Sequence, residues 1–69
     1  MRSLRSVIQS HVDEHWGNNH DTTSRVIQFG LYIFDRDARE PDTIVTMYPR
    51  RREWVAWNTS NGYLTYGDF

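Results

Sequence analysis

The first part of the chain has the apolar spacing of an amphipathic helix. Its apolar residues recur every three or four positions, at Leu4, Val7, Ile8, Val12 and Trp16. This spacing places them on one side of a helix and leaves polar residues on the other. Ser3 can cap the first turn with its hydroxyl, and Gly17 is a natural stop because glycine accepts a left-handed backbone. We predict a helix over residues 3–16 and a polar surface loop over residues 17–24.

Beyond residue 24 the chain is rich in β-branched and aromatic residues that alternate with polar ones, as in half-buried strands. Turn-forming residues divide this region at Glu40-Pro41-Asp42, Pro49-Arg50-Arg51 and Asn61-Gly62. The strands are expected over residues 25–34, 43–48, 52–60 and 63–67. Asn61-Gly62 favours a two-residue type I′ turn, which would pair Ser60 with Tyr63, Thr59 with Leu64 and Trp57 with Tyr66.

The links between the four predicted strands are short. Short links favour antiparallel pairing of consecutive strands, because parallel pairing needs a long crossover. We therefore predict a single small α+β domain over residues 1–69. In this fold the N-terminal amphipathic helix packs on one face of a four-stranded antiparallel meander sheet.

One face of the predicted sheet is almost wholly apolar and is expected to pack against the helix. Its side chains are those of Ile27, Phe29, Leu31, Ile33, Val45, Met47, Val55, Trp57, Leu64 and Tyr66. The opposite face mixes aromatic rings with amides and hydroxyls. Its side chains are those of Gln28, Tyr32, Phe34, Ile44, Thr46, Tyr48, Trp54, Asn58, Tyr63 and Thr65.

The second face has no predicted cover, because the one helix occupies the first. Exposed aromatic residues mixed with polar groups are typical of recognition surfaces. Three interpretations stay open: loops and arginine side chains fold over this face, a second copy forms a homodimer, or a different protein binds there. A chain this short gains little net stability from folding alone, which favours self-association or a stable partner.

The composition narrows the class of protein. With 38% hydrophobic and 25% charged residues, the chain lies within the globular range. Because it has no cysteine, a disulfide framework, a thiolate metal site and a cysteine nucleophile are excluded. The N-terminal residues have no uninterrupted apolar run, so neither a signal peptide nor a membrane span is expected. We expect a cytoplasmic protein, or one of the host cytoplasm if the gene is viral.

The basic residues are all arginine, and three of them are consecutive, at Arg50, Arg51 and Arg52. Arginine suits pairing with carboxylates, phosphates and aromatic faces. The triplet lies between Tyr48 and Trp54, and this mixture of basic and aromatic residues is also used to bind single-stranded nucleic acid. Three consecutive basic residues most often form a solvated turn, and this is the favoured interpretation. The alternatives are an acidic protein partner and nucleic acid, and the net charge of -1, which provides no general attraction to a polyanion, weakens the case for nucleic acid.

The three histidines fall within ten residues, at His11, His15 and His20. His11 and His15 are one helical turn apart, as zinc ligands often are, and His20 could add a third ligand. We favour the alternative that His11 and His15 flank the buried side of the helix, so no metal or other cofactor is expected.

Sequence signatures of known enzyme classes are missing from the chain. A small ribonuclease could use His15, Tyr48, Arg52 and Glu53, but their spacing does not single out this chemistry. We therefore expect a protein without catalytic activity.

These observations favour a non-catalytic module that binds a protein partner, a second copy of itself, or both. The expected contact residues are Tyr32, Phe34, Tyr48, Arg50, Arg51, Arg52, Trp54 and Tyr63. In size and composition the chain is similar to small inhibitors and adaptors encoded by phages and mobile elements. The alternative is a protein that binds single-stranded nucleic acid through the Arg50–Arg52 turn and its neighbouring aromatic residues.

Overall fold

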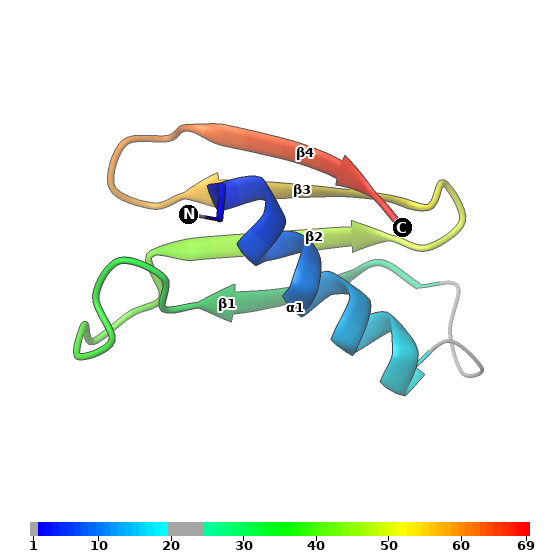
Figure 1. Cartoon of the computed structure of the whole chain (residues 1–69), viewed down its shortest axis with the longest axis horizontal. Coiled ribbons are helices and arrows are strands. Elements are labelled where there is room, and N and C mark those ends of the chain that lie inside the picture. Colours follow the sequence, from blue (N-terminus) through cyan, green and yellow to red (C-terminus); the bar gives the residue numbers. More distant parts are fainter. Residues whose placement is uncertain (1, 20–24) are drawn as a thin grey trace.

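The computed structural model describes residues 2–19 and 25–69, which form one helix and four strands. The elements are α1 (Leu4–Asn19), β1 (Ile27–Leu31), β2 (Thr43–Tyr48), β3 (Glu53–Asn58) and β4 (Leu64–Asp68). The strands lie in the order β1-β2-β3-β4, and each pairs antiparallel with the next. The predicted α+β fold, a helix on an antiparallel meander, is confirmed (Figure 1).

Helix α1 begins where its capping residue predicts. The Ser3 hydroxyl accepts a hydrogen bond from the Ser6 amide at 3.1 Å, which satisfies one of the free N–H groups of the first turn. At the other end the helix continues through Gly17 to Asn19. Gly17 is therefore not the stop that the sequence predicted, because glycine inside a helix costs only about 1 kcal/mol and does not force the chain to turn.

The helix crosses one face of the sheet diagonally (Figure 1). Near its start, the Arg5 side chain donates a hydrogen bond to the Tyr66 carbonyl of β4 at 3.1 Å. Near its end, His15 stacks on Phe29 of β1 with ring centroids 3.9 Å apart. The helix is thereby held against both edge strands.

The core lies between the helix and the sheet. Its fully or nearly fully buried apolar residues are Ile8, Val12, Leu31, Val45, Met47, Trp54 and Ala56. Trp54 is the largest of them and is 1% exposed. Its indole N–H donates to the Gln9 side chain at 3.2 Å, so the polar atom of the ring is satisfied. A Cβ atom at Gly67 would lie 2.3 Å from the indole ring, so this glycine leaves the room that Trp54 occupies.

Strand β1 is shorter than the predicted strand over residues 25–34. The backbone N–H groups of Ile33, Phe34 and Asp35 donate to the Asp42 carboxylate at 2.9–3.1 Å instead of continuing the strand. The Thr43 hydroxyl donates to the same carboxylate at 2.9 Å. Asp42 therefore fixes the loop that joins β1 to β2.

Burial of the Asp42 side chain, which is 9% exposed, would by itself raise the pKa of its carboxyl. The hydrogen bonds from Phe34, Ile33, Thr43 and Asp35 together outweigh burial and lower the pKa below its ordinary value of 3.8. The carboxylate is thus the favoured form in the folded protein.

The loop between β2 and β3 is one residue longer than predicted, and this changes which side chains of β3 face the helix. Tyr48 pairs with Glu53, so the loop has four residues, Pro49–Arg52, whereas the sequence predicted a turn of three, Pro49–Arg51. The additional loop residue, Arg52, has a left-handed φ of 53°. Because side chains alternate along a strand, one extra loop residue turns every side chain of β3 to the opposite face.

The two faces are as predicted for β1 and β2, and the prediction is wrong for β3 and β4. Met47 lies opposite Trp54, and Val45 lies opposite Ala56, so Trp54 and Ala56 face the helix. Trp57, which was expected in the core, is 48% exposed. The side chains that change faces with it are Val55, Leu64 and Tyr66, and those that move to the helix side are Asn58, Tyr63 and Thr65.

The β3–β4 connection also differs from the prediction. Asn58 donates its backbone N–H to the Tyr63 carbonyl at 2.9 Å, which closes a four-residue loop rather than the predicted two-residue turn. Gly62, the last loop residue, supplies the left-handed φ of 73°. The Asn58 side chain accepts hydrogen bonds from the backbone N–H groups of Ser60 and Asn61, which stabilises the longer loop. Consequently Trp57 pairs with Leu64 and not with Tyr66.

Candidate functional site

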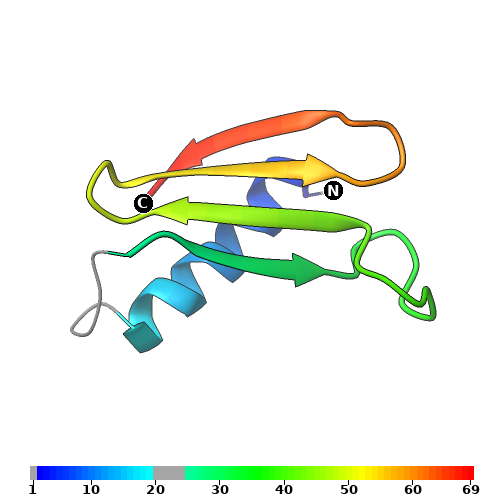
Figure 2. The ribbon, with the colours of Figure 1, turned by 180° about the vertical axis from the view of Figure 1, so that it is seen from behind.

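The sheet has one face that the described helix leaves uncovered, and we call it the open face (Figure 2). Its side chains point away from the core residues of the same strands. They are those of Gln28, Ile44, Thr46, Tyr48, Glu53, Val55, Trp57, Leu64, Tyr66 and Asp68. Seven of these ten are aliphatic, aromatic or threonine, and the two carboxylates lie together in the last row with Tyr48.

The apolar residues of the open face form two adjacent rows across the strands. One row joins Ile44, Trp57 and Leu64, which are cross-strand partners. The next row joins Thr46, Val55 and Tyr66. Trp57 and Leu64 keep nearly half of their surface exposed, and Tyr66 is 63% exposed. Cross-strand neighbours have Cβ atoms about 5 Å apart, so these side chains make one continuous surface.

The β1 side of the open face is more polar and more closely packed. The Gln28 amide donates to the Thr46 hydroxyl at 3.2 Å across the strands. Gly30 has no side chain, and Pro41 lies where its Cβ atom would point, at 2.4 Å from that position. The exposed apolar surface is therefore concentrated on β3 and β4.

The arginine triplet lies at the end of the open face. The Arg51 guanidinium lies over the Tyr48 ring, 5.8 Å from its centroid, which is within cation–π range. Arg50 and Arg51 line a hollow of about 300 Å³ together with Val26, Tyr48 and Pro49. Arg50 and Arg51 therefore border the apolar surface at this end, beside the carboxylates of Glu53 and Asp68.

A second, smaller hollow lies on the helix side of the sheet. Its volume is about 70 Å³, and it is lined by Leu4 and Ile8 of the helix and by Phe34, Asn58 and Tyr63, among others. Phe34 and Tyr63 are both well exposed, at 63% and 64%. They lie beside the start of the helix and not on the open face.

The predicted contact residues are therefore divided between several places. Tyr48, Arg50 and Arg51 lie at the end of the open face, with Arg52 in the same loop. Phe34 and Tyr63 line the helix-side hollow, and Tyr32 is exposed just beyond β1. The prediction that Trp54 is exposed is wrong, because this residue is the largest in the core.

The structure places His11 and His15 on the helix. His15 stacks on Phe29, and His11 is exposed on the same helix, whereas His20 lies outside the described residues. Within residues 2–19 and 25–69, no group of three histidine or acidic side chains is arranged to hold a metal ion. Among the ribonuclease candidates, His15 is separated by the sheet from Tyr48 and Glu53, which belong to the open face.

Sequence reasoning missed Trp57, Leu64, Tyr66 and Val55 as open-face residues. The alternation in β3 is ambiguous, because Trp54 and Ala56 on one side are as apolar as Val55 and Trp57 on the other. The signal that could have decided was the glycine at position 67. Only a residue without a side chain leaves room for a buried indole opposite it, and Gly67 pairs with Trp54.

Comparison with protein-family models, with curated proteins and with solved structures gives no match. In the part of the chain that the structure describes, no helix has the length and apolar character needed to cross a membrane.

Proposed function

We propose that the protein is a non-catalytic module that binds a protein partner, either a different protein or a second copy of itself, through its open face. The observation that carries the proposal is the continuous surface of Trp57, Leu64 and Tyr66, which no described element covers. A small inhibitor or adaptor acts in this way, by occupying a partner's surface.

The residue types of the open face support protein recognition. Tryptophan and tyrosine are enriched among residues that dominate binding energy, because each buries a large area at little cost in side-chain entropy. The neighbouring Arg51, held over Tyr48, adds a charged group at the rim, where charges set orientation and association rate. An apolar centre with a charged rim is the usual anatomy of such an interface.

Site-specific photo-crosslinking tests the proposal. Benzoylphenylalanine is introduced at Tyr66 on the open face and, as the matched control, at Tyr63. Both tyrosines are exposed to nearly the same extent, 63% and 64%, and lie three residues apart on opposite sides of the sheet. We expect a discrete protein adduct from position 66 and none from position 63 in cells that express the protein. Equal labelling at the two positions, or none at position 66, would refute the proposal.

Nucleic-acid binding is the second candidate, and the Arg51–Tyr48 contact beside Arg50 and Arg52 is the observation in its favour. If the three arginines neutralise about three phosphates, the affinity for single-stranded RNA or DNA falls with salt at a log–log slope of about -2. Replacing all three by alanine then flattens the slope. We expect binding no better than millimolar near physiological salt, because the net charge is -1. Micromolar, salt-sensitive binding would favour this candidate.

A further inference from the structure

We infer that the partner on the open face is a second copy of this chain. The two sheets stack face to face, and each end of one sheet lies over the opposite end of the other. This inference rests on the proposed function, because it names the protein that the open face binds. Three independent features of the structure lead to it: the exposed apolar side chains, the state of the β4 edge and the distribution of charge.

The open face exposes large apolar side chains that a partner would cover. Trp57, Leu64 and Tyr66 are 48%, 46% and 63% exposed and adjoin one another on β3 and β4. Contiguous exposed apolar surface of this kind commonly marks a protein interface. A second copy stacked on the open face would remove these side chains from water.

The outer edge of β4 favours stacking over edge-to-edge pairing. The inward-facing backbone groups include those of Tyr63 and Phe69, which hydrogen-bond to Asn58 and Arg52 across the hairpin. Along an antiparallel edge strand the backbone N–H and C=O groups of alternate residues point inward and outward, so those of Tyr66 point outward. The Arg5 side chain already donates a hydrogen bond to the outward-pointing Tyr66 carbonyl. A strand added to this edge would have to displace Arg5, whereas a copy stacked on the open face leaves the contact intact.

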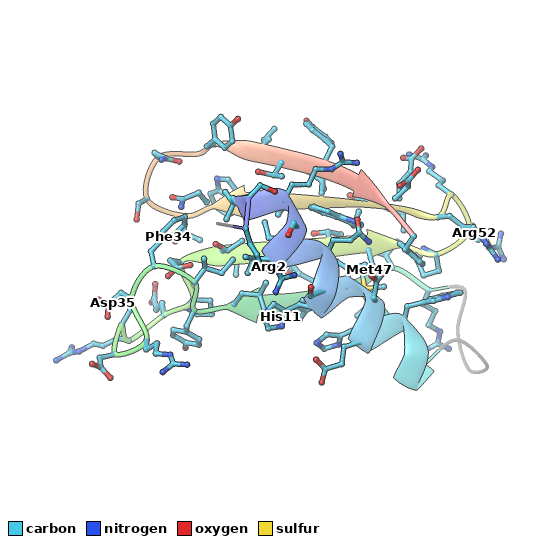
Figure 3. The ribbon with its side chains drawn as sticks, viewed as in Figure 1. Arg2, His11, Phe34, Asp35, Met47 and Arg52 are labelled. Carbon is cyan, nitrogen blue, oxygen red and sulfur yellow. The ribbon has the colours of Figure 1, made fainter. Side chains whose placement is uncertain are left out.

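The two ends of the sheet carry opposite charge, and Figure 3 shows one residue of each end, Arg52 and Asp35. Among the described side chains of the sheet and its loops, four arginines outnumber two carboxylates at the β2–β3 end, which leaves +2. These residues are Arg25, Arg50, Arg51, Arg52, Glu53 and Asp68. At the β1–β2 end, four carboxylates outnumber two arginines, which leaves -2. These residues are Asp35, Asp37, Glu40, Asp42, Arg36 and Arg39.

This polarity selects the orientation of the second copy. A twofold axis that runs parallel to the strands would place like ends of the two sheets together. An axis in the plane of the interface and perpendicular to the strands places the basic end of each copy over the acidic end of the other. Opposite charges within about 8 Å, the screening distance at physiological salt, attract one another. The second arrangement is therefore the one that the charges favour.

Sedimentation equilibrium of the full chain between about 1 and 500 µM tests the association. We expect a dimer that dissociates on dilution. Tyr66→Thr, which keeps a strand-forming residue, is expected to raise the dissociation constant at least about tenfold. Its matched control, Tyr63→Thr, should leave the constant within about twofold. A monomer throughout this range, or equal effects of the two variants, would overturn the inference.

A charge exchange tests the orientation. Replacing Arg50 and Arg51 by glutamate should raise the dissociation constant about tenfold at low salt and less at high salt. Adding Asp37→Arg and Glu40→Arg to the same chain should restore it. An unchanged dissociation constant in the first variant, or a further weakening of the dimer in the second, would refute the arrangement in which the basic end of each copy lies over the acidic end of the other.

The two proposals fail in different ways. If the chain is monomeric while position 66 still crosslinks to a different protein, the open face binds proteins but its partner is not a second copy. If position 66 gives no protein adduct of any mass, both proposals are wrong. An adduct of twice the chain mass, together with a dimer in sedimentation, supports both.

Discussion

Truncating the two tryptophans of β3 separates the buried face of the sheet from the open one. A buried tryptophan removes about 200 Å² of surface from water, which corresponds to about 5 kcal/mol at ~25 cal/mol per Å². Trp54 is 1% exposed, and Trp54→Ala also leaves the Gln9 side chain without its indole partner. We expect this variant to lose about 4–5 kcal/mol of unfolding free energy, which is close to the total stability of a domain of this size.

Trp57→Ala is the matched comparison, since it removes the same side chain from the same strand. Trp57 keeps 48% of its surface exposed, and its truncation opens no enclosed cavity. Since only about half of the side chain is buried, we expect a loss of about 2–2.5 kcal/mol by the same area rule.

The assay for both variants is urea unfolding followed by circular dichroism. It is run at the lowest practical protein concentration, so that loss of a dimer does not add to the effect of Trp57→Ala. Trp54→Phe serves as a milder variant that still folds if Trp54→Ala does not. A loss from Trp57→Ala that equals or exceeds that from Trp54→Ala would refute the strand register and, with it, the open face.

Three further substitutions test individual contacts. Gly67→Ala should destabilise the fold by at least ~2 kcal/mol in thermal unfolding, because its Cβ atom would clash with the indole of Trp54, and a normal melting temperature would contradict this packing. The lowered pKa of Asp42 means that its stabilising contribution is present above pH 3.8 and is lost as the pH falls below that value, so Asp42→Asn should flatten the acid dependence of the melting temperature. Arg52→Gly should stabilise the protein by about 0.5–1 kcal/mol by relieving the left-handed backbone, whereas Arg50→Gly should destabilise it by a similar amount in the same urea titration.

The helix and the strands were predictable because each has a local signal. The apolar spacing that includes Ile8 and Val12 locates the buried side of the helix, and both residues are fully buried. Alternation placed Val45 and Met47 correctly, because the opposite side of β2 carries the hydroxyls of Thr46 and Tyr48 beside Ile44. The hydrophobic pattern thus defines a face wherever only one side of a strand is apolar.

The register of β3 was not predictable from alternation, because both of its sides are apolar. It depends on a single residue, Arg52, which belongs to the loop rather than to the strand. Arginine rarely adopts a left-handed backbone, so nothing local indicates a four-residue loop. The hydrogen bonds of Asp42 were equally hidden, since they join a carboxylate to amides seven to nine residues away.

The error in the register of β3 also affected the predicted contact residues. Composition indicated exposed aromatic residues next to arginine, and Arg51 lies over Tyr48 at one end of the open face. Its centre was assigned to the wrong side chains, because the face of β3 decides whether Trp54 or Trp57 meets solvent. A functional surface on a sheet can be located from sequence only as well as the strand register is known.

Hydroxyl-radical footprinting as a function of protein concentration tests the central claim most directly, because it reports which side chains become covered. We expect oxidation of Trp57 and Tyr66 to fall at least severalfold between about 1 and 500 µM, while oxidation of Tyr63, equally exposed on the other side, stays constant. Constant oxidation of Trp57 and Tyr66 over this range, or protection that appears at Tyr63 instead, would contradict the account.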